Sequence, residues 1–130
     1  MCVCRCHGGN TIHKEALPYA NCVGVALVFI FGGSPIGPQK AELYSKQPDI
    51  LIATPGRLLD ILGNLQESKA AKAAPVRRSL CLQETRLLIL DEADKMLSMG
   101  FEADVRKIVS RTAQLRQTLF FTATWPQVPP

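Results

Sequence analysis

Three carboxylates stand within four positions of one another, directly after a short apolar run. Asp91, Glu92 and Asp94 follow the run 87–90, which is typical of a buried parallel strand covered on both faces. In open parallel sheets, ligands bind beyond the carboxyl ends of the strands. Acids at that position can hold a hard cation such as Mg²⁺ and orient a water molecule. Alternatively, Asp91 and Glu92 are acids favoured by the dipole at a helix N-terminus.

Two further polar segments follow predicted strands. They are Thr54-Pro55-Gly56-Arg57 and Thr122-Ala123-Thr124. The first opens a helix, where free N–H groups attract phosphate, and its hydroxyl and guanidinium groups could add to that binding. The two threonine hydroxyls of the second could bond Asp94 across neighbouring strands, although strand propensity and helix capping also explain them. In a parallel sheet, both segments and the acids reach the same edge.

The elements that position these segments alternate along the chain. Strands are expected over 23–31, 50–53, 87–90 and 117–123, and helices over 12–20, 36–46, 58–62 and 101–113. Pro18 is expected to bend or end the first helix. This alternation predicts an α/β protein with a right-handed, parallel sheet flanked by helices.

Composition is that of one globular domain. The chain has 130 residues, of which 47% are hydrophobic and 20% charged, and a net charge of +4. That charge permits nucleic-acid binding without requiring it. The longest apolar stretch, 22–31, is too short to cross a membrane, so no membrane association is expected. Five cysteines without a disulfide framework indicate an intracellular, reducing compartment.

Three stretches lie outside the alternating pattern. Residues 1–11 are rich in cysteine and lack the apolar core of a signal peptide, so a disordered leader is expected there. A metal site is the alternative, but the C-x-C-x-C run has no second pair of the kind that zinc sites use. Residues 66–82 form a basic insertion, interpreted as a solvated surface loop rather than an RNA-binding arm. Residues 127–130 form a tail.

Four motifs in chain order resemble those of the first RecA-like domain of a DEAD-box ATP-dependent RNA helicase. They are Gly32-Gly33, Thr54-Pro55-Gly56-Arg57, Asp91-Glu92-Ala93-Asp94 and Thr122-Ala123-Thr124. The resemblance extends over residues 12–126. It implies a partial RecA-like P-loop NTPase domain, with a parallel sheet flanked by helices.

The resemblance also implies roles for these residues. Asp91 would serve the Mg²⁺ of bound ATP through water, and Glu92 would activate the hydrolytic water. Asp94 would interact with the segment 122–124 and so link hydrolysis to strand separation. The path of the RNA backbone would follow Gly32, Gly33, Thr54, Pro55, Gly56 and Arg57. RNA would be bound with little sequence specificity, in the nucleus or the cytoplasm.

The chain departs from the family pattern in several ways. It contains no G-x-x-x-x-G-K-[ST] phosphate loop, adenine-reading Q motif, P-T-R-E-L motif or second RecA-like domain. Thr122 stands where the family usually has Ser, and the stretch between Arg57 and Asp91 is longer than usual. In the family, the strand that carries the phosphate loop lies beside the strand that ends in the 122–124 segment, and this sequence offers no counterpart of it. The apolar segment 119–121 is therefore expected to form an unpaired edge.

These departures lead to one main expectation and two alternatives. We expect a truncated helicase domain that neither hydrolyses ATP nor unwinds RNA by itself, because little is present to hold the triphosphate. The first alternative is a module that binds the RNA backbone without ATP. The second is a remnant without a function.

Overall fold

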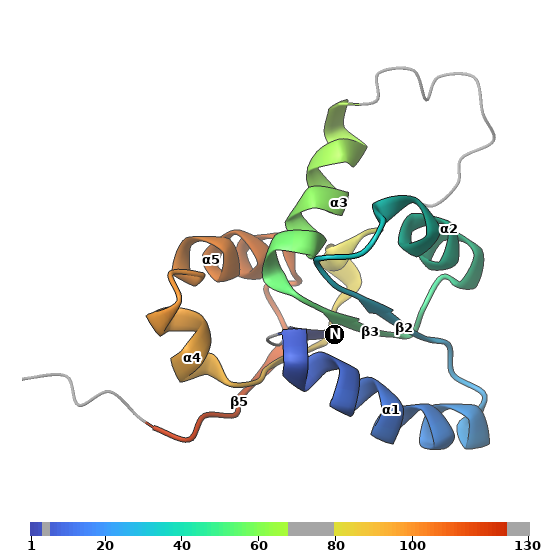
Figure 1. The fold of residues 1–130 in the computed structure, drawn as a ribbon, viewed down its shortest axis with the longest axis horizontal. Helices are drawn as coiled ribbons and strands as arrows, with labels where there is room; N and C mark the ends of the chain where they lie inside the picture. Colours follow the sequence, from blue (N-terminus) through green and yellow to red (C-terminus); the bar gives the residue numbers. More distant parts are fainter. Residues whose placement is uncertain (4–5, 68–79, 125–130) are drawn as a thin grey trace, which may run out of the picture.

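Within the described residues, five parallel strands form one sheet, in agreement with the α/β fold predicted from the sequence. The computed structural model describes residues 1–3, 6–67 and 80–124 (Figure 1). The spatial order of the strands is β2-β3-β1-β4-β5. Their bounds are Cys2–Val3 for β1, Leu27–Ile30 for β2, Ile50–Ala53 for β3, Leu87–Leu90 for β4 and Gln117–Phe120 for β5.

The helices cover the two faces of this sheet unequally. Their bounds are Cys6–Val23 for α1, Ile36–Lys46 for α2, Pro55–Glu67 for α3, Ala93–Ser98 for α4 and Glu102–Arg111 for α5, with a 3₁₀ turn, η2, at Leu82–Glu84. In Figure 1, α1 lies alone below the sheet, and α2 and α3 lie above it. Residues on the strands alternate between the faces: Val28 and Leu51 join the larger core, whereas Leu27 and Ile52 pack with α1.

Strand β4 is buried on one face and partly open on the other. Leu88 and Leu90 lie in the larger core, but Leu87 is exposed and Ile89 is half-buried. The prediction of a strand fully covered on both faces is therefore wrong. The reason is that α1, the helix of the second face, packs on β2 and β3 and leaves β4 partly uncovered.

The N-terminal residues form the central strand of the sheet. Cys2–Val3 pairs with β3 on one side and with β4 on the other. Ile89 N donates a hydrogen bond to Met1 O (2.9 Å), Asp91 N donates one to Val3 O (3.0 Å), and Val3 is completely buried. The disordered leader expected over residues 1–11 is therefore wrong, because sheet pairing on both sides orders its first residues and α1 begins at Cys6.

Several element boundaries also differ from those predicted. Helix α1 continues through Pro18 to Val23, and the chain then turns at Gly24, where φ is 71°, before β2 begins. Packing of α1 against the sheet outweighs the loss of one helical hydrogen bond at the proline. Helix α3 begins at Pro55, a residue that suits the first turn of a helix, and extends to Glu67.

Parts of the predicted insertion and tail lie outside the described residues. Residues 68–79 of the insertion and the whole tail, 127–130, belong to this group. At the far end of the insertion, Leu82 is buried in the larger core. Within the described part of the chain, no helix is long and apolar enough to cross a membrane.

Candidate functional site

The carboxyl ends of β3, β4 and β5 bring the three predicted polar segments to one edge of the sheet. Thr54 directly follows β3, Asp91 follows β4, and the segment 122–124 follows β5 by one residue. Two backbone hydrogen bonds join the ends of β4 and β5: Phe121 N donates to Leu90 O (2.8 Å) and Ala93 N donates to Phe121 O (3.1 Å). Strand β1 lies between β3 and β4, so its end also reaches this edge.

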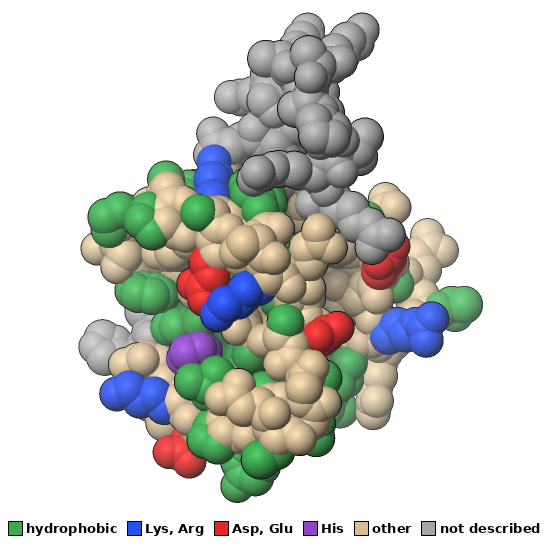
Figure 2. Space-filling view, turned by 90° about the vertical axis from the view of Figure 1, so that its right-hand side faces the viewer, with side chains coloured by type: hydrophobic (Ala, Val, Ile, Leu, Met, Phe, Trp, Pro, Cys, Tyr) green, Lys and Arg blue, Asp and Glu red, His purple; other side chains and the backbone are tan. Residues whose placement is uncertain are grey.

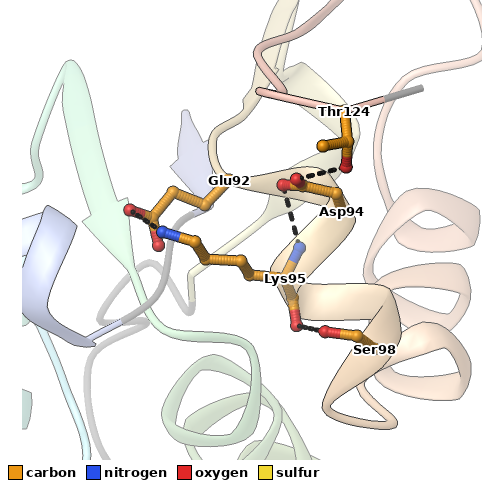
Figure 3. A network of polar contacts seen from close by, with 5 residues as sticks. All are labelled: Glu92, Asp94, Lys95, Ser98 and Thr124. Atoms are coloured by element: carbon orange, nitrogen blue, oxygen red, sulfur yellow. Dashed lines mark hydrogen bonds and ion pairs between the residues drawn. The ribbon is translucent and has the colours of Figure 1, made fainter.

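A direct hydrogen bond connects the acidic segment to the threonine segment. Thr124 Oγ1 donates to Asp94 Oδ2 at 2.7 Å, as Figure 3 shows. The other carboxylate oxygen, Asp94 Oδ1, accepts from Lys95 N at 2.9 Å. Thr122 Oγ1 donates to Thr124 O at 2.7 Å, which closes the turn that presents Thr124. The contact predicted between Asp94 and this segment is present, made by Thr124.

These donors favour the ionised form of Asp94. The Thr124 hydroxyl has the largest effect and lowers the pKa of the Asp94 carboxyl below its ordinary value. Partial burial opposes this shift, while the Lys95 N–H and the Thr122 hydroxyl add to it. Asp94 is therefore a carboxylate near neutral pH and acts as a hydrogen-bond acceptor.

Glu92 adopts a backbone conformation that is rare for a residue with a side chain. Its φ is 52° and its ψ is 44°, in the left-handed region. Its carboxylate lies 3.3 Å from Lys95 Nζ, and in Figure 3 the Glu92 side chain extends toward the Lys95 amine and away from Thr124. Strained backbones of this kind persist where the surrounding structure holds them and are frequent at functional sites.

Asp91 lies at the end of β4 beside the first turns of α1. A Cβ atom placed on Gly8 would lie 3.6 Å from Asp91 Oδ2, so α1 passes close to this carboxylate. Among the described residues, no group of three or more His, Cys, Asp and Glu side chains could hold a metal ion. Mg²⁺ commonly uses one or two carboxylates together with water and substrate phosphates. Asp91 fits such a shared site, but not a site made by protein ligands alone.

The structure joins the Gly32-Gly33 motif to the segment that opens α3. Gly32 N donates a hydrogen bond to Thr54 Oγ1 (3.3 Å), and Arg57 Nη2 donates one to Ser34 O (2.8 Å). Thr54 is buried, and the Nε and Nη1 atoms of Arg57 are buried without a hydrogen-bond partner. The side chains of Thr54 and Arg57 therefore turn toward the loop that contains Gly32 and Gly33, here called the glycine loop. The sequence did not predict this orientation.

One residue at this loop was not identified from the sequence. Gln39 of α2 is 8% exposed, and its side-chain amide makes two hydrogen bonds to the backbone of Phe31. Phe31 N donates to Gln39 Oε1 (2.9 Å), and Gln39 Nε2 donates to Phe31 O (3.1 Å). A signal was available, because Gln39 precedes Leu43 by four residues and so shares the buried face of the predicted helix.

Comparison with known proteins identifies a family. Residues 10–129 match the family model described as DEAD/DEAH box helicase. The chain is 43% identical over 116 residues to DEAD-box ATP-dependent RNA helicase 40 of Arabidopsis thaliana. It is also 43% identical over 116 residues to ATP-dependent RNA helicase-like protein DB10 of Nicotiana sylvestris. Each match includes 89% of this chain but only 9% and 17%, respectively, of the relative.

Solved structures show the same fold. The crystal structure of the yeast DEAD-box splicing factor Prp28 matches with a TM-score of 0.78 and 30% identity, over 96% of this chain and 28% of that chain. A hypothetical ATP-dependent RNA helicase from Sulfolobus tokodaii matches with a TM-score of 0.75 and 26% identity, over 97% of this chain and 34% of that chain. The described residues therefore have a RecA-like arrangement and span about a third or less of these structures.

Proposed function

This chain belongs to the DEAD/DEAH box helicase family, and we propose that it contributes part of the nucleotide site and part of the RNA path of an ATP-dependent RNA helicase. The main support is the hydrogen bond from Thr124 Oγ1 to Asp94 Oδ2, which connects the ends of two strands beside the acidic segment. Members of this family are named as ATP-dependent RNA helicases. Placement in the nucleus or the cytoplasm stays a prediction.

Asp91 and Glu92 have different proposed roles in ATP hydrolysis. Asp91 would hold Mg²⁺ through water, as one carboxylate of a site that substrate phosphates complete. Bound Mg–ATP would supply the phosphoanhydride bond that is hydrolysed. Glu92, beside Asp91, would orient a water molecule and accept its proton. Lys95 Nζ lies 3.3 Å from Glu92 Oε1 and would help to hold this side chain in place.

Asp94 has a different proposed role, because its carboxylate oxygens are engaged by Thr124 and Lys95. The hydrogen bond to Thr124 ties the start of α4 to the segment that follows β5. A displacement of that segment would lengthen or break this bond and so alter the position of the neighbouring acids. We therefore propose that Asp94 connects hydrolysis to movement of the RNA-binding parts of the protein.

The proposed RNA path uses the glycine loop and the start of α3. Helix N-termini and glycine-rich loops present backbone N–H groups, which suit phosphate oxygens. On the face shown in Figure 2, Lys and Arg side chains are scattered among acidic and apolar groups. A broad basic patch on that face therefore does not explain RNA binding. We propose instead that the RNA backbone is recognised locally, by Gly32, Gly33, Thr54, Pro55, Gly56 and Arg57.

An RNA titration tests this proposal. The 130-residue chain is expected to bind a single-stranded RNA of about ten nucleotides, with an affinity that falls as salt increases. Because Arg57 is proposed to contact a phosphate, Arg57→Gln should reduce the slope of log K against log salt by about 0.7. Fluorescence anisotropy measures both quantities. An unmodified chain without measurable RNA affinity at low salt would refute the proposed RNA function.

We also propose that these 130 residues alone do not turn over ATP. The sequence contains no G-x-x-x-x-G-K-[ST] loop to hold the phosphates, and each charge-assisted hydrogen bond contributes about 1.5–3 kcal/mol. Phosphate release with RNA and Mg–ATP should equal that of the Glu92→Gln variant. Release above that variant would contradict the proposal.

The ATP-independent RNA-binding module remains a second candidate. It is supported by the glycine loop, which Thr54 and Arg57 hold without any nucleotide. Adding Mg–ATP distinguishes the two candidates. RNA affinity that is unchanged by Mg–ATP favours the module, whereas affinity that increases with Mg–ATP favours a working nucleotide site.

A further inference from the structure

We propose that Gln39 is a positioning residue that fixes the shape of the Gly32-Gly33 loop and thereby sets the affinity of the chain for an RNA backbone. The inference rests on the proposed RNA function of this loop. It assigns to Gln39 no contact with RNA, because both polar atoms of its side-chain amide are already used by Phe31.

In the part of the chain that the structure describes, β2 has no strand on its outer side, and the two hydrogen bonds of Gln39 take the place of that neighbour. Strand β2 is at the edge of the sheet and pairs with β3 on its other side. Phe31 directly follows β2, and both its N–H and its C=O bond to the Gln39 amide. A primary amide offers one donor group and one acceptor, as a neighbouring peptide group would. Gln39 therefore binds the backbone of the residue that follows β2 as a neighbouring strand would.

Burial makes this interaction difficult to replace with water. Gln39 is 8% exposed and belongs to a helix that packs against β2. When one partner of a buried hydrogen bond is removed, the other bears the full cost of losing water. A substitution at Gln39 would therefore release Phe31 from its position, because its N–H and C=O would have to move to find solvent.

Three side chains together hold consecutive parts of the loop. Gln39 holds Phe31, Thr54 holds Gly32 and Arg57 holds Ser34. Between the last two points, Gly33 has a φ of 82°, which a glycine adopts without strain. A backbone fixed in this way loses little conformational entropy when it binds a ligand, so its affinity is higher than that of a mobile loop.

Two substitutions separate positioning from contact. Gln39→Leu retains much of the side-chain volume but removes both hydrogen bonds. We expect RNA affinity to fall about tenfold, with an unchanged salt slope, because no phosphate contact is lost. Arg57→Gln provides the contrast. It also releases Ser34, but because it removes a positive charge it should reduce the salt slope as well as the affinity.

Gln39→Glu provides a pH-dependent rescue. A protonated carboxyl group offers one donor and one acceptor, as the amide does, whereas a carboxylate repels the Phe31 carbonyl oxygen. Burial and that oxygen raise the pKa of the introduced acid, so RNA affinity should be near that of the unmodified chain at about pH 5 and reduced at about pH 8. Gln114→Glu, at an exposed position, is the charge-matched control and should show no such rescue.

The experiment measures RNA anisotropy at both pH values and amide hydrogen exchange of Phe31 and Gly32 by NMR. The proposal requires faster exchange in Gln39→Leu, together with rescue of Gln39→Glu in acid. Unchanged exchange and affinity in Gln39→Leu would overturn it, even if the unmodified chain binds RNA. Faster exchange in a chain whose unmodified form does not bind RNA would refute the RNA role and leave only the loop-holding role.

Discussion

At the scale of single residues, Asp94 is the best-defined acid of the site. Its carboxylate accepts hydrogen bonds from Thr124 Oγ1 and Lys95 N, and the pKa of the carboxyl group is lowered mainly by Thr124. Because the folded-state pKa is depressed, the contribution of Asp94 to stability is complete above the ordinary carboxyl pKa. It is lost as the pH falls through the lowered value.

The Thr124→Val substitution tests this arrangement. Valine has the shape of threonine without the hydroxyl, so the pKa of Asp94 should rise toward that of a free aspartate. An NMR titration of the carboxyl carbon measures it. Thr122→Val should give a smaller rise, because the Thr122 hydroxyl has a smaller effect on this pKa. Equal shifts in the two variants would contradict the assignment of Thr124 as the main donor.

Glu92 carries backbone strain that its side chain does not relieve. Its φ of 52° is unfavourable for any residue except glycine and, to a lesser degree, asparagine or aspartate. Glu92→Gly and Glu92→Ala both remove the ion pair with Lys95, but only glycine also removes the strain. We expect Glu92→Gly to be more stable than Glu92→Ala by about 1 kcal/mol, measured by urea unfolding. Equal stability would show that this conformation is not strained.

At the scale of elements, β1 controls whether the sheet is continuous. The two residues of β1 lie between β3 and β4 in the sheet, and their backbone pairs with both of these strands. Asp91 itself donates a backbone hydrogen bond to Val3 O (3.0 Å), so the first acid of the site is placed by the N-terminal strand. Loss of β1 would therefore disturb both the core and the acidic segment.

The Val3→Asp substitution tests the importance of β1. Val3 is completely buried between two strands, and a carboxylate there would lose its water without gaining a partner. We expect the free energy of unfolding to fall by more than about 3 kcal/mol. Val23→Asp is the matched control, since Val23 is 72% exposed at the end of α1. Similar stability of the two variants in thermal unfolding would exclude a central position for β1.

At the scale of the whole molecule, the sheet has an uncovered end. Among the described residues, strand β5 pairs with β4 alone, and Phe120 and Phe121 are 56% and 54% exposed. The unpaired apolar edge predicted from the sequence at 119–121 is therefore present in part, with Leu119 half-buried. Exposed strand edges with large apolar side chains promote association between molecules.

The 130-residue chain is accordingly expected to self-associate through β5. Phe120→Lys places a charge on this edge and should reduce association, measured by sedimentation velocity over a range of concentrations. Leu115→Lys is the control, because Leu115 is 94% exposed but lies before β5. If both variants reduce association equally, general surface hydrophobicity is responsible. A sharp thermal transition from a monomer would contradict the prediction itself.

Local patterns in the sequence were sufficient for several elements. The bounds of α2, β3 and β4 were predicted correctly, because short apolar runs and helical spacing are bounded there by Gly, Pro or charged residues. The meeting of the three polar segments at one sheet edge also followed from the sequence, since all parallel strands end on the same side. The role of each acid in catalysis stays a prediction.

Tertiary contacts decided what local pattern could not. A two-residue strand has no periodicity to detect, so the position of Cys2–Val3 at the centre of the sheet depends on hydrogen bonds to strands about 50 and 87 residues away in sequence. The orientation of Thr54 and Arg57 and the two hydrogen bonds of Gln39 likewise exist only once α2, α3 and β2 are packed together. The order of residues along the chain shows which side chains carry groups suited to catalysis or binding. Packing decided which of them lie close enough to act together, because hydrogen bonds require atoms within about 3 Å.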